Sequence, residues 1–163
     1  MLTKEMRRLV AEQRLGFVAT VCPDGTPNLS PKGTVAVWDD DHLVFADICS
    51  PRTVANLRAN PAVEVNVVDP FARRGYRFKG TGTVLADGPA FAEVVAFFRA
   101  RGSRSPIRSV VLVAVARALP VVSPAYATGA TEAEVQARWE PHYRALMRGE
   151  AQARPGDDAT DPR

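Results

Sequence analysis

The sequence is poor in cysteine and has no long hydrophobic run. Its two cysteines, Cys22 and Cys49, form no Cys-x-x-Cys pair, which excludes a disulfide scaffold. No apolar run approaches the roughly 18 residues that a membrane-spanning helix needs, and no signal-peptide core follows the N-terminal Met-Leu-Thr-Lys-Glu. We therefore expect a soluble, cytoplasmic protein that has no membrane partner.

The sequence also lacks a strong charge of one sign. It has 21 Lys and Arg against 18 Asp and Glu, a net charge of +3, and its arginines are scattered along the chain. Nucleic-acid-binding proteins usually have a basic stripe with interleaved aromatic residues. We therefore expect no nucleic-acid partner; that alternative predicts an affinity that falls steeply with salt.

Motifs of hydrolases and nucleotide-binding enzymes are missing as well. The sequence has no Gly-x-Ser-x-Gly elbow, no Walker loop and no Gly-x-Gly-x-x-Gly. The two cysteines, His42 and His142 have no metal-ligand spacing, and the aspartates at 39–41 are typical of a solvated turn. We expect no metal site, and we assign no side chain as a general acid or base.

Short apolar segments separated by turn residues make up most of the chain, and 46% of its 163 residues are hydrophobic, as in an ordinary single domain. Periodicity predicts helices near the start, after Ser50-Pro51, after Asp87-Gly88-Pro89 and after the capping box of Thr131 and Glu134. It predicts strands at 17–21, 28–38, 42–46, 62–68, 76–85 and 110–122, the first three joined as an antiparallel meander. Pro141 should kink or split the last helix. The pattern indicates an α+β fold, a small six-stranded antiparallel β-barrel with flanking helices.

The segment Ser50-Pro51-Arg52-Thr53 has the features of an anion site. Serine is a good N-cap and proline is favoured at the first helical position, so a helix is expected to begin here. A helix N-terminus presents unpaired N–H groups and a partial positive charge, to which Arg52 adds a guanidinium and Thr53 a hydroxyl. The alternative is an ordinary capped surface helix with its arginine in solvent.

The segment Ser30-Pro31-Lys32-Gly33-Thr34 supports the first interpretation. In an extended strand Ser30, Lys32 and Thr34 share one face, and Gly33 allows a flat ring to lie against the backbone. Together the two segments fit a ligand with a phosphate at one end and an aromatic ring system at the other. Taken alone, this segment is also typical of a solvent-facing strand.

Seven motifs follow one another in the first three quarters of the chain: Gly16–Thr20, Pro23–Asn28, Ser30–Gly33, Val44–Asp47, Arg52–Leu57, Asn60-Pro61 and Gly75–Gly80. In this order they resemble the FMN-binding split barrels of the pyridoxamine 5′-phosphate oxidase-like family. The likeness covers roughly residues 1–125. No single motif is diagnostic, and the specificity lies in their order.

The resemblance implies a homodimer with two FMN molecules at the subunit interface. The strand from Ser30 to Thr34 would lie along the flavin ring and ribityl chain, with Lys32 near the negative charge of the reduced ring. The start of the following helix would hold the phosphate, and the strand around Gly75 would come from the second subunit. The residues expected to bind the cofactor are Ser30, Pro31, Lys32, Gly33, Thr34, Ala46, Asp47, Arg52, Thr53, Gly75 and Lys79.

The resemblance further implies an FMN-dependent oxidoreductase that acts on a small molecule by two-electron transfer through flavin N5. True pyridoxamine-phosphate oxidases have a C-terminal strand with Trp and Arg motifs that this sequence lacks, so we do not expect that activity. One alternative is a flavin-binding electron carrier or sensor without turnover. Another is a reductase that uses a deazaflavin, whose acidic tail would bind Arg73, Arg74 and Arg77. A haem-binding relative would need a ligand such as His142.

The extent of the family resemblance suggests how the chain is divided. We expect the FMN-binding split barrel at residues 1–125 and a C-terminal helical extension at 126–148. From Gly149 onward there is no large apolar residue, which predicts a disordered tail at 149–163.

Overall fold

The computed structural model describes residues 1–150, and the predicted tail at 149–163 lies almost entirely outside them. The elements are α1 (Lys4–Gln13), β1 (Gly16–Val21), β2 (Pro27–Lys32), β3 (Ala36–Val37), β4 (His42–Asp47), α2 (Pro51–Ala59), β5 (Ala62–Asp69), β6 (Arg74–Leu85), α3 (Gly88–Ala100), β7 (Ser109–Val122), the 3-10 helix η1 (Pro124–Thr128) and α4 (Glu132–Met147). The chain divides into two compact units. The first holds Met1–Asp69 and Arg74–Val122, and the second holds Pro70–Arg73 and the chain from Ser123 onward.

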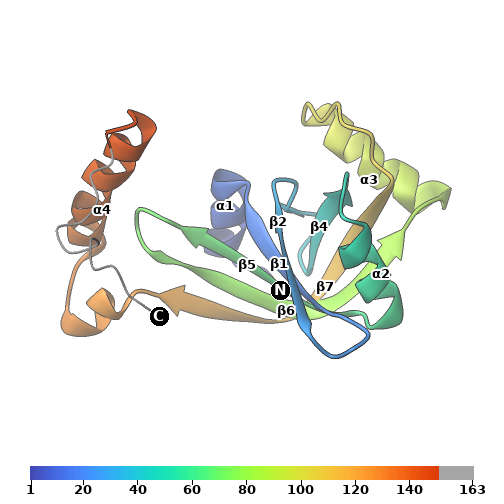
Figure 1. Ribbon diagram of the computed structural model, residues 1–163, viewed down its shortest axis with the longest axis horizontal. Helices are drawn as coiled ribbons and strands as arrows, with labels where there is room; N and C mark the ends of the chain where they lie inside the picture. Colours follow the sequence, from blue (N-terminus) through green and yellow to red (C-terminus); the bar gives the residue numbers. More distant parts are fainter. Residues whose placement is uncertain (151–163) are drawn as a thin grey trace, which may run out of the picture. The chain divides into compact units, whose positions relative to one another are not determined.

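The first unit is built on one curled antiparallel sheet (Figure 1). Its seven strands lie in the order β2-β1-β5-β6-β7-β4-β3, and α1, α2 and α3 each contact it. This confirms the predicted α+β fold with an antiparallel split barrel and flanking helices. No helix in the described part of the chain is long and apolar enough to cross a membrane.

The strand predicted at 28–38 is wrong in its extent, and this accounts for seven strands in place of six. It divides into β2, which ends at Lys32, and the two-residue β3, with a turn between them. The predicted meander is also wrong, because β2 and β3 lie at opposite ends of the strand order. Alternation along a strand indicates which face is buried, but it carries no information about which strand becomes the neighbour.

Two hydrophobic clusters form the core of the first unit. The larger one fills the barrel and includes Val18, Phe45, Val65, Phe78 and Val111, all nearly inaccessible to solvent. The smaller one lies where Val94 and Phe98 of α3 pack on Val44, Ala46 and Val110 of the sheet. The two clusters therefore hold opposite faces of β4 and β7, whose ends carry part of the candidate site.

Local signals account for the helices. Thr3 Oγ1 accepts a hydrogen bond of 3.3 Å from the Met6 amide at the start of α1, and the predicted capping box of Thr131 and Glu134 begins α4. α4 runs as one element through Pro141, so the helix is not split. Within the second unit α4 is held by ring contacts such as Phe71 with Tyr143, whose centroids are 5.0 Å apart.

The β-bulge of β6 gives a test of sheet packing. Gly80 lies beside the register shift against β7, where an added Cβ would come within 1.9 Å of the Ala114 carbonyl oxygen. We expect Gly80→Ala to lower the free energy of unfolding by about 1–3 kcal/mol through overpacking, measured by urea denaturation. Gly33→Ala is the matched control, because its added Cβ would meet no atom closer than 3.9 Å. Equal stability losses in the two variants would contradict this explanation.

Candidate functional site

The first turn of α2 has backbone N–H groups that find no acceptor within the helix. Ser50 occupies the N-cap position, as predicted, but its side chain makes no capping hydrogen bond, and Pro51 has no amide hydrogen. The amide of Val54 donates to the Ser50 carbonyl at 3.3 Å. The N–H groups of Arg52 and Thr53 are therefore left to another acceptor at the positive end of the helix dipole.

The Ser50 hydroxyl is instead bound by a buried lysine. Lys32, at the end of β2, is only 5% exposed, and its Nζ donates to Ser50 Oγ at 2.7 Å and to Ser30 Oγ. Burial lowers the pKa of Lys32 below its ordinary value, while the negative charge of Asp47 acts in the opposite direction. A cation is thus held directly beside the N-terminus of α2.

Asp47 organises the turn that leads into this helix. Its Oδ1 accepts from the Ser50 amide at 2.7 Å, and its Oδ2 accepts from Ser109 Oγ at 3.4 Å. The Asp47 side chain is buried, so its carboxylate serves the turn between β4 and α2 and the first residue of β7. The role of Ser109 was missed from the sequence, because nothing local signals that it pairs with Asp47 in the sheet register.

The turn after β2 is held to β4 by a pair of hydrogen bonds. Thr34 Oγ1 accepts from the Ala46 amide at 3.0 Å and donates to the Ala46 carbonyl at 3.3 Å. The neighbouring Gly33 is exposed, and an added Cβ would meet nothing nearer than the Arg14 carbonyl at 3.9 Å. No packing within the described chain therefore requires glycine here, and a flat ligand has room to approach the backbone.

Two residues assigned to the phosphate differ in their surroundings. Arg52 is exposed, whereas Thr53 is only 2% exposed and lies on the buried face of α2. The Arg52 guanidinium is therefore free to reach a ligand at the surface. For Thr53 the group that faces the open end of the helix is its backbone N–H.

The structure brings most of the predicted residues together but leaves two of them apart. Ser30, Lys32, Thr34, Ala46 and the start of α2 are joined by the contacts above. Gly75 and Lys79 lie on β6, where Gly75 has a reason for being glycine within the sheet: an added Cβ would come within 2.1 Å of the Val67 carbonyl oxygen. Lys79 Nζ lies 3.3 Å from a carboxylate oxygen of Glu64. Their assignment to a neighbouring subunit's cofactor stays a prediction.

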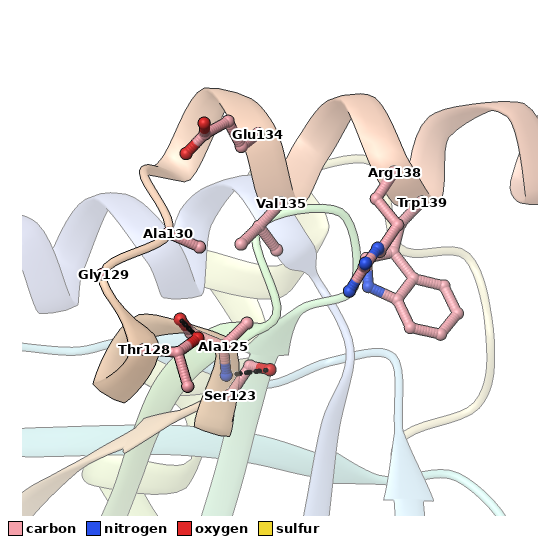
Figure 2. Close-up of a pocket in the computed structure, with 9 residues that line it drawn as sticks. All are labelled: Ser123, Ala125, Thr128, Gly129, Ala130, Glu134, Val135, Arg138 and Trp139. Atoms are coloured by element: carbon pink, nitrogen blue, oxygen red, sulfur yellow. Dashed lines mark hydrogen bonds between the residues drawn. The ribbon is translucent and has the colours of Figure 1, made fainter.

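The second unit contains a separate hollow of about 410 Å³ (Figure 2). Arg138 and Trp139 extend from α4 on one side, and the 3-10 helix forms the other. None of the predicted cofactor residues lines it; the lining residues are Ser123, Ala125, Thr128, Gly129, Ala130, Glu134, Val135, Arg138 and Trp139. No group of three or more His, Cys, Asp or Glu in the described part of the chain is placed to hold a metal ion.

Comparison with solved structures places the fold among known proteins. The crystal structure of HupZ from Group A Streptococcus is 30% identical, with a TM-score of 0.68, over 76% of this chain and 96% of that one. A structure named F420 reductase is 26% identical, with a TM-score of 0.55, over 72% of this chain and 98% of that one. An FMN-binding protein from Syntrophomonas wolfei, 18% identical with a TM-score of 0.63 over 75% of this chain and 87% of that one, shares the fold alone.

Sequence comparison gives the family. Protein MJ0282 of Methanocaldococcus jannaschii is 29% identical over 89 residues, which are 53% of this chain and 58% of that protein. The aligned part therefore spans less than two thirds of the relative's length. The model of the pyridoxamine 5′-phosphate oxidase family matches residues 2–121 of this chain. This match confirms the resemblance inferred from the seven motifs. The chain belongs to the pyridoxamine 5′-phosphate oxidase family.

Proposed function

We propose that this protein is an FMN-binding flavoprotein that holds the cofactor's phosphate at the start of α2. The observation that carries the proposal is the buried Lys32, whose ammonium lies 2.7 Å from the Ser50 hydroxyl at the uncapped end of the helix. An ammonium has three donors, and two of them are directed at Ser50 and Ser30. The third donor, the N–H groups of the first helical turn and the Arg52 guanidinium suit the oxygens of a phosphate.

The open backbone beside Gly33 supports a place for the flavin ring along the turn after β2. In this arrangement Lys32 lies at the phosphate end of the cofactor. We therefore propose that its positive charge interacts with the phosphate and not with the reduced flavin ring. Thr34, bonded to Ala46, keeps this turn against β4. The chain's own residues bind and orient the cofactor.

We propose an oxidoreductase role, in which bound FMN supplies two-electron transfer through its N5 position. Two observations support it: membership of the pyridoxamine 5′-phosphate oxidase family and the likeness to a protein named F420 reductase. The described residues around the start of α2 include no histidine, and the Asp47 carboxylate is committed to Ser50 and Ser109. We therefore assign the protein's part to positioning and electrostatics, with a small molecule as substrate.

A deazaflavin is the second candidate cofactor, favoured by the likeness to a protein named F420 reductase. The arginines considered for its acidic tail already have neighbours. Arg74 and Arg77 lie 3.8 and 3.7 Å from the carboxylates of Glu5 and Glu64, and Arg73 stacks 4.1 Å from the centroid of the Trp139 ring. These contacts favour FMN, which does not need an extended basic groove.

We propose that the protein is a homodimer that uses the outer face of the sheet. Phe17 and Leu29 point outward from β1 and β2 and are 42% and 63% exposed. One row of register partners crosses β2, β1, β5 and β6 on this face: Leu29, Ala19, Glu64 and Lys79. A second copy that covered the apolar end of this row would also bring β6 near a neighbouring subunit, as the assignment of Gly75 and Lys79 requires.

The proposal is tested by the absorption spectrum of the purified protein, by FMN titration and by identification of any released chromophore by mass. We expect about one FMN per chain, since each chain carries one α2 start with these contacts. Analytical ultracentrifugation should give twice the mass of one chain. A colourless protein that takes up neither FMN nor a deazaflavin would overturn the cofactor assignment, and uptake followed by no turnover with NAD(P)H and an acceptor would favour the carrier or sensor.

A further inference from the structure

The buried polar residues of this chain gather around α2. Within residues 1–150 two of them, Thr53 and Asn56, lie on the helix itself. The other four are hydrogen-bonded, directly or through one another, to the helix or to Ser50 before it; they are Thr20, Lys32, Asp47 and Ser109. Buried polar groups cost free energy unless they are hydrogen-bonded, and an apolar contact would seat a helix more simply. Their concentration under one nine-residue helix therefore needs an explanation.

One of these chains lies under the middle of the helix. Asn56, 2% exposed, donates from Nδ2 to Thr20 Oγ1 at 3.0 Å and lies 3.5 Å from Cys22 Sγ. Asn28 of β2 donates to the same Thr20 oxygen at 3.2 Å. Thr20 is 3% exposed as a residue, and its hydroxyl oxygen joins β1, β2 and α2 at a single atom.

The strand β2 is turned toward this network. Asn28, Ser30 and Lys32 face inward, while Leu29 and Pro31 are exposed, which reverses the usual arrangement of polar and apolar residues. The inward polar row runs from the Thr20 contact at Asn28 to the Ser50 contact at Lys32. Helix and strand are thus joined at two points, one under Asn56 and the other at the helix start.

These two hydrogen-bonded points determine the position and rotation of α2 relative to β2 more closely than apolar packing alone would. Val54 and Leu57 are also buried on this helix, and their apolar contacts are non-directional. Hydrogen bonds are directional, and a fully satisfied buried network selects one arrangement. Asn56 lies one helical turn beyond the N–H groups of Arg52 and Thr53, so it fixes the direction in which those groups point.

We propose that Thr20 and Asn56 are positioning residues that hold the start of α2 in register with Lys32, so that the helix N–H groups and the lysine converge on one phosphate. This inference rests on the proposed function. Neither residue touches the cofactor in this arrangement; both act through the helix. The arrangement depends on Thr20 Oγ1, which accepts hydrogen bonds from Asn28 and Asn56.

The test compares Thr20→Val with Thr20→Ser. Valine has nearly the shape of threonine but offers no acceptor to Asn28 and Asn56, whereas serine keeps the hydroxyl. We expect Thr20→Val to weaken FMN binding about tenfold, as expected from the loss of one or two hydrogen bonds, and Thr20→Ser to restore it. Binding is measured by fluorescence titration at a temperature where circular dichroism shows each apoprotein to be fully folded.

Val54→Ala is the matched control on the same helix. It removes apolar contact from a residue 7% exposed and should lower the melting temperature while leaving the FMN dissociation constant within about twofold of wild type. An unchanged affinity in Thr20→Val, a failed rescue by serine or an equal loss of affinity in Val54→Ala would each overturn the positioning role.

Hydrogen exchange of the apoprotein separates this inference from the proposed function. We expect the α2 amides to exchange faster in Thr20→Val than in wild type, and at the wild-type rate in Thr20→Ser. Unchanged exchange in Thr20→Val would overturn the holding role whether or not FMN binds. A wild-type protein that binds no FMN but shows the expected exchange would overturn the proposed function alone and leave the Thr20–Asn56 anchor supported.

Discussion

Replacing Arg52 with alanine is expected to weaken FMN binding about 10- to 150-fold, because a charge-assisted contact to phosphate contributes about 1.5–3 kcal/mol. The apoprotein should keep its stability, since an exposed arginine contributes roughly 0–1 kcal/mol to folding. The measurement is a fluorescence titration with FMN, combined with thermal unfolding of the apoprotein.

Arg58→Ala is the matched control for this variant. Arg58 is also exposed and lies in the last turn of the same helix, away from its N-terminus. FMN affinity should therefore be unchanged in Arg58→Ala. If Arg52→Ala binds FMN as tightly as wild type, or if both variants lose affinity equally, the phosphate does not lie at the start of α2.

Replacing Lys32 with methionine should produce a comparable loss of FMN affinity, about 10- to 150-fold, because a buried cation beside the phosphate is removed. Methionine fills a similar volume, and the Ser30 and Ser50 hydroxyls remain able to bond to each other or to water. Removing the ammonium leaves the buried Asp47 carboxylate without a nearby positive charge, so the apoprotein should be less stable than wild type, and FMN is titrated at a temperature where circular dichroism shows the variant to be folded. Lys4→Met, at an exposed position on α1, serves as the control.

The pH dependence of the same variant tests the charge itself. Burial lowers the pKa of Lys32 below its ordinary value of 10.5, so the ammonium loses its proton at a lower pH in the folded apoprotein than in the unfolded chain. The unfolded chain then binds more protons in that window, and the stability of the apoprotein should rise with pH toward 10.5. FMN affinity should change in the opposite direction and fall as the cation is lost. Lys32→Met should lack both trends and keep only the opposite contribution of Tyr76, whose raised pKa lowers stability as the pH rises above 10.0. Titration of the ligand itself would appear equally in both proteins.

Elements with a local cause could be predicted from the sequence. The Thr3 cap, the Ser50-Pro51 start of α2 and the capping box at Thr131 each involve residues within one turn of one another. Such interactions form without knowledge of the rest of the chain. The proposal of an anion site at the start of α2 rests on the same local rules and stays a prediction.

Other features depended on partners distant in the sequence. The inward face of β2 is the polar one because Thr20 and Ser50, brought there by β1 and the turn before α2, supply hydrogen-bond partners. Without those partners the same alternation predicts a polar face in solvent. The hydrogen bond from Ser109 to Asp47 joins residues 62 positions apart, and no local sequence motif indicates it.

The fold class, the family resemblance and the helix starts could be predicted from the sequence, because periodicity, caps and the order of motifs are local properties of the chain. The burial of Lys32 against Ser50, and the hydrogen bond from the Ser50 amide to Asp47, are seen only in the folded chain. The same is true of the hydrogen bond from Asn56 on the buried face of α2 to Thr20 of β1. Burial and hydrogen bonding are properties of neighbours in space, and these neighbours meet only when the strands pair and α2 packs against the sheet.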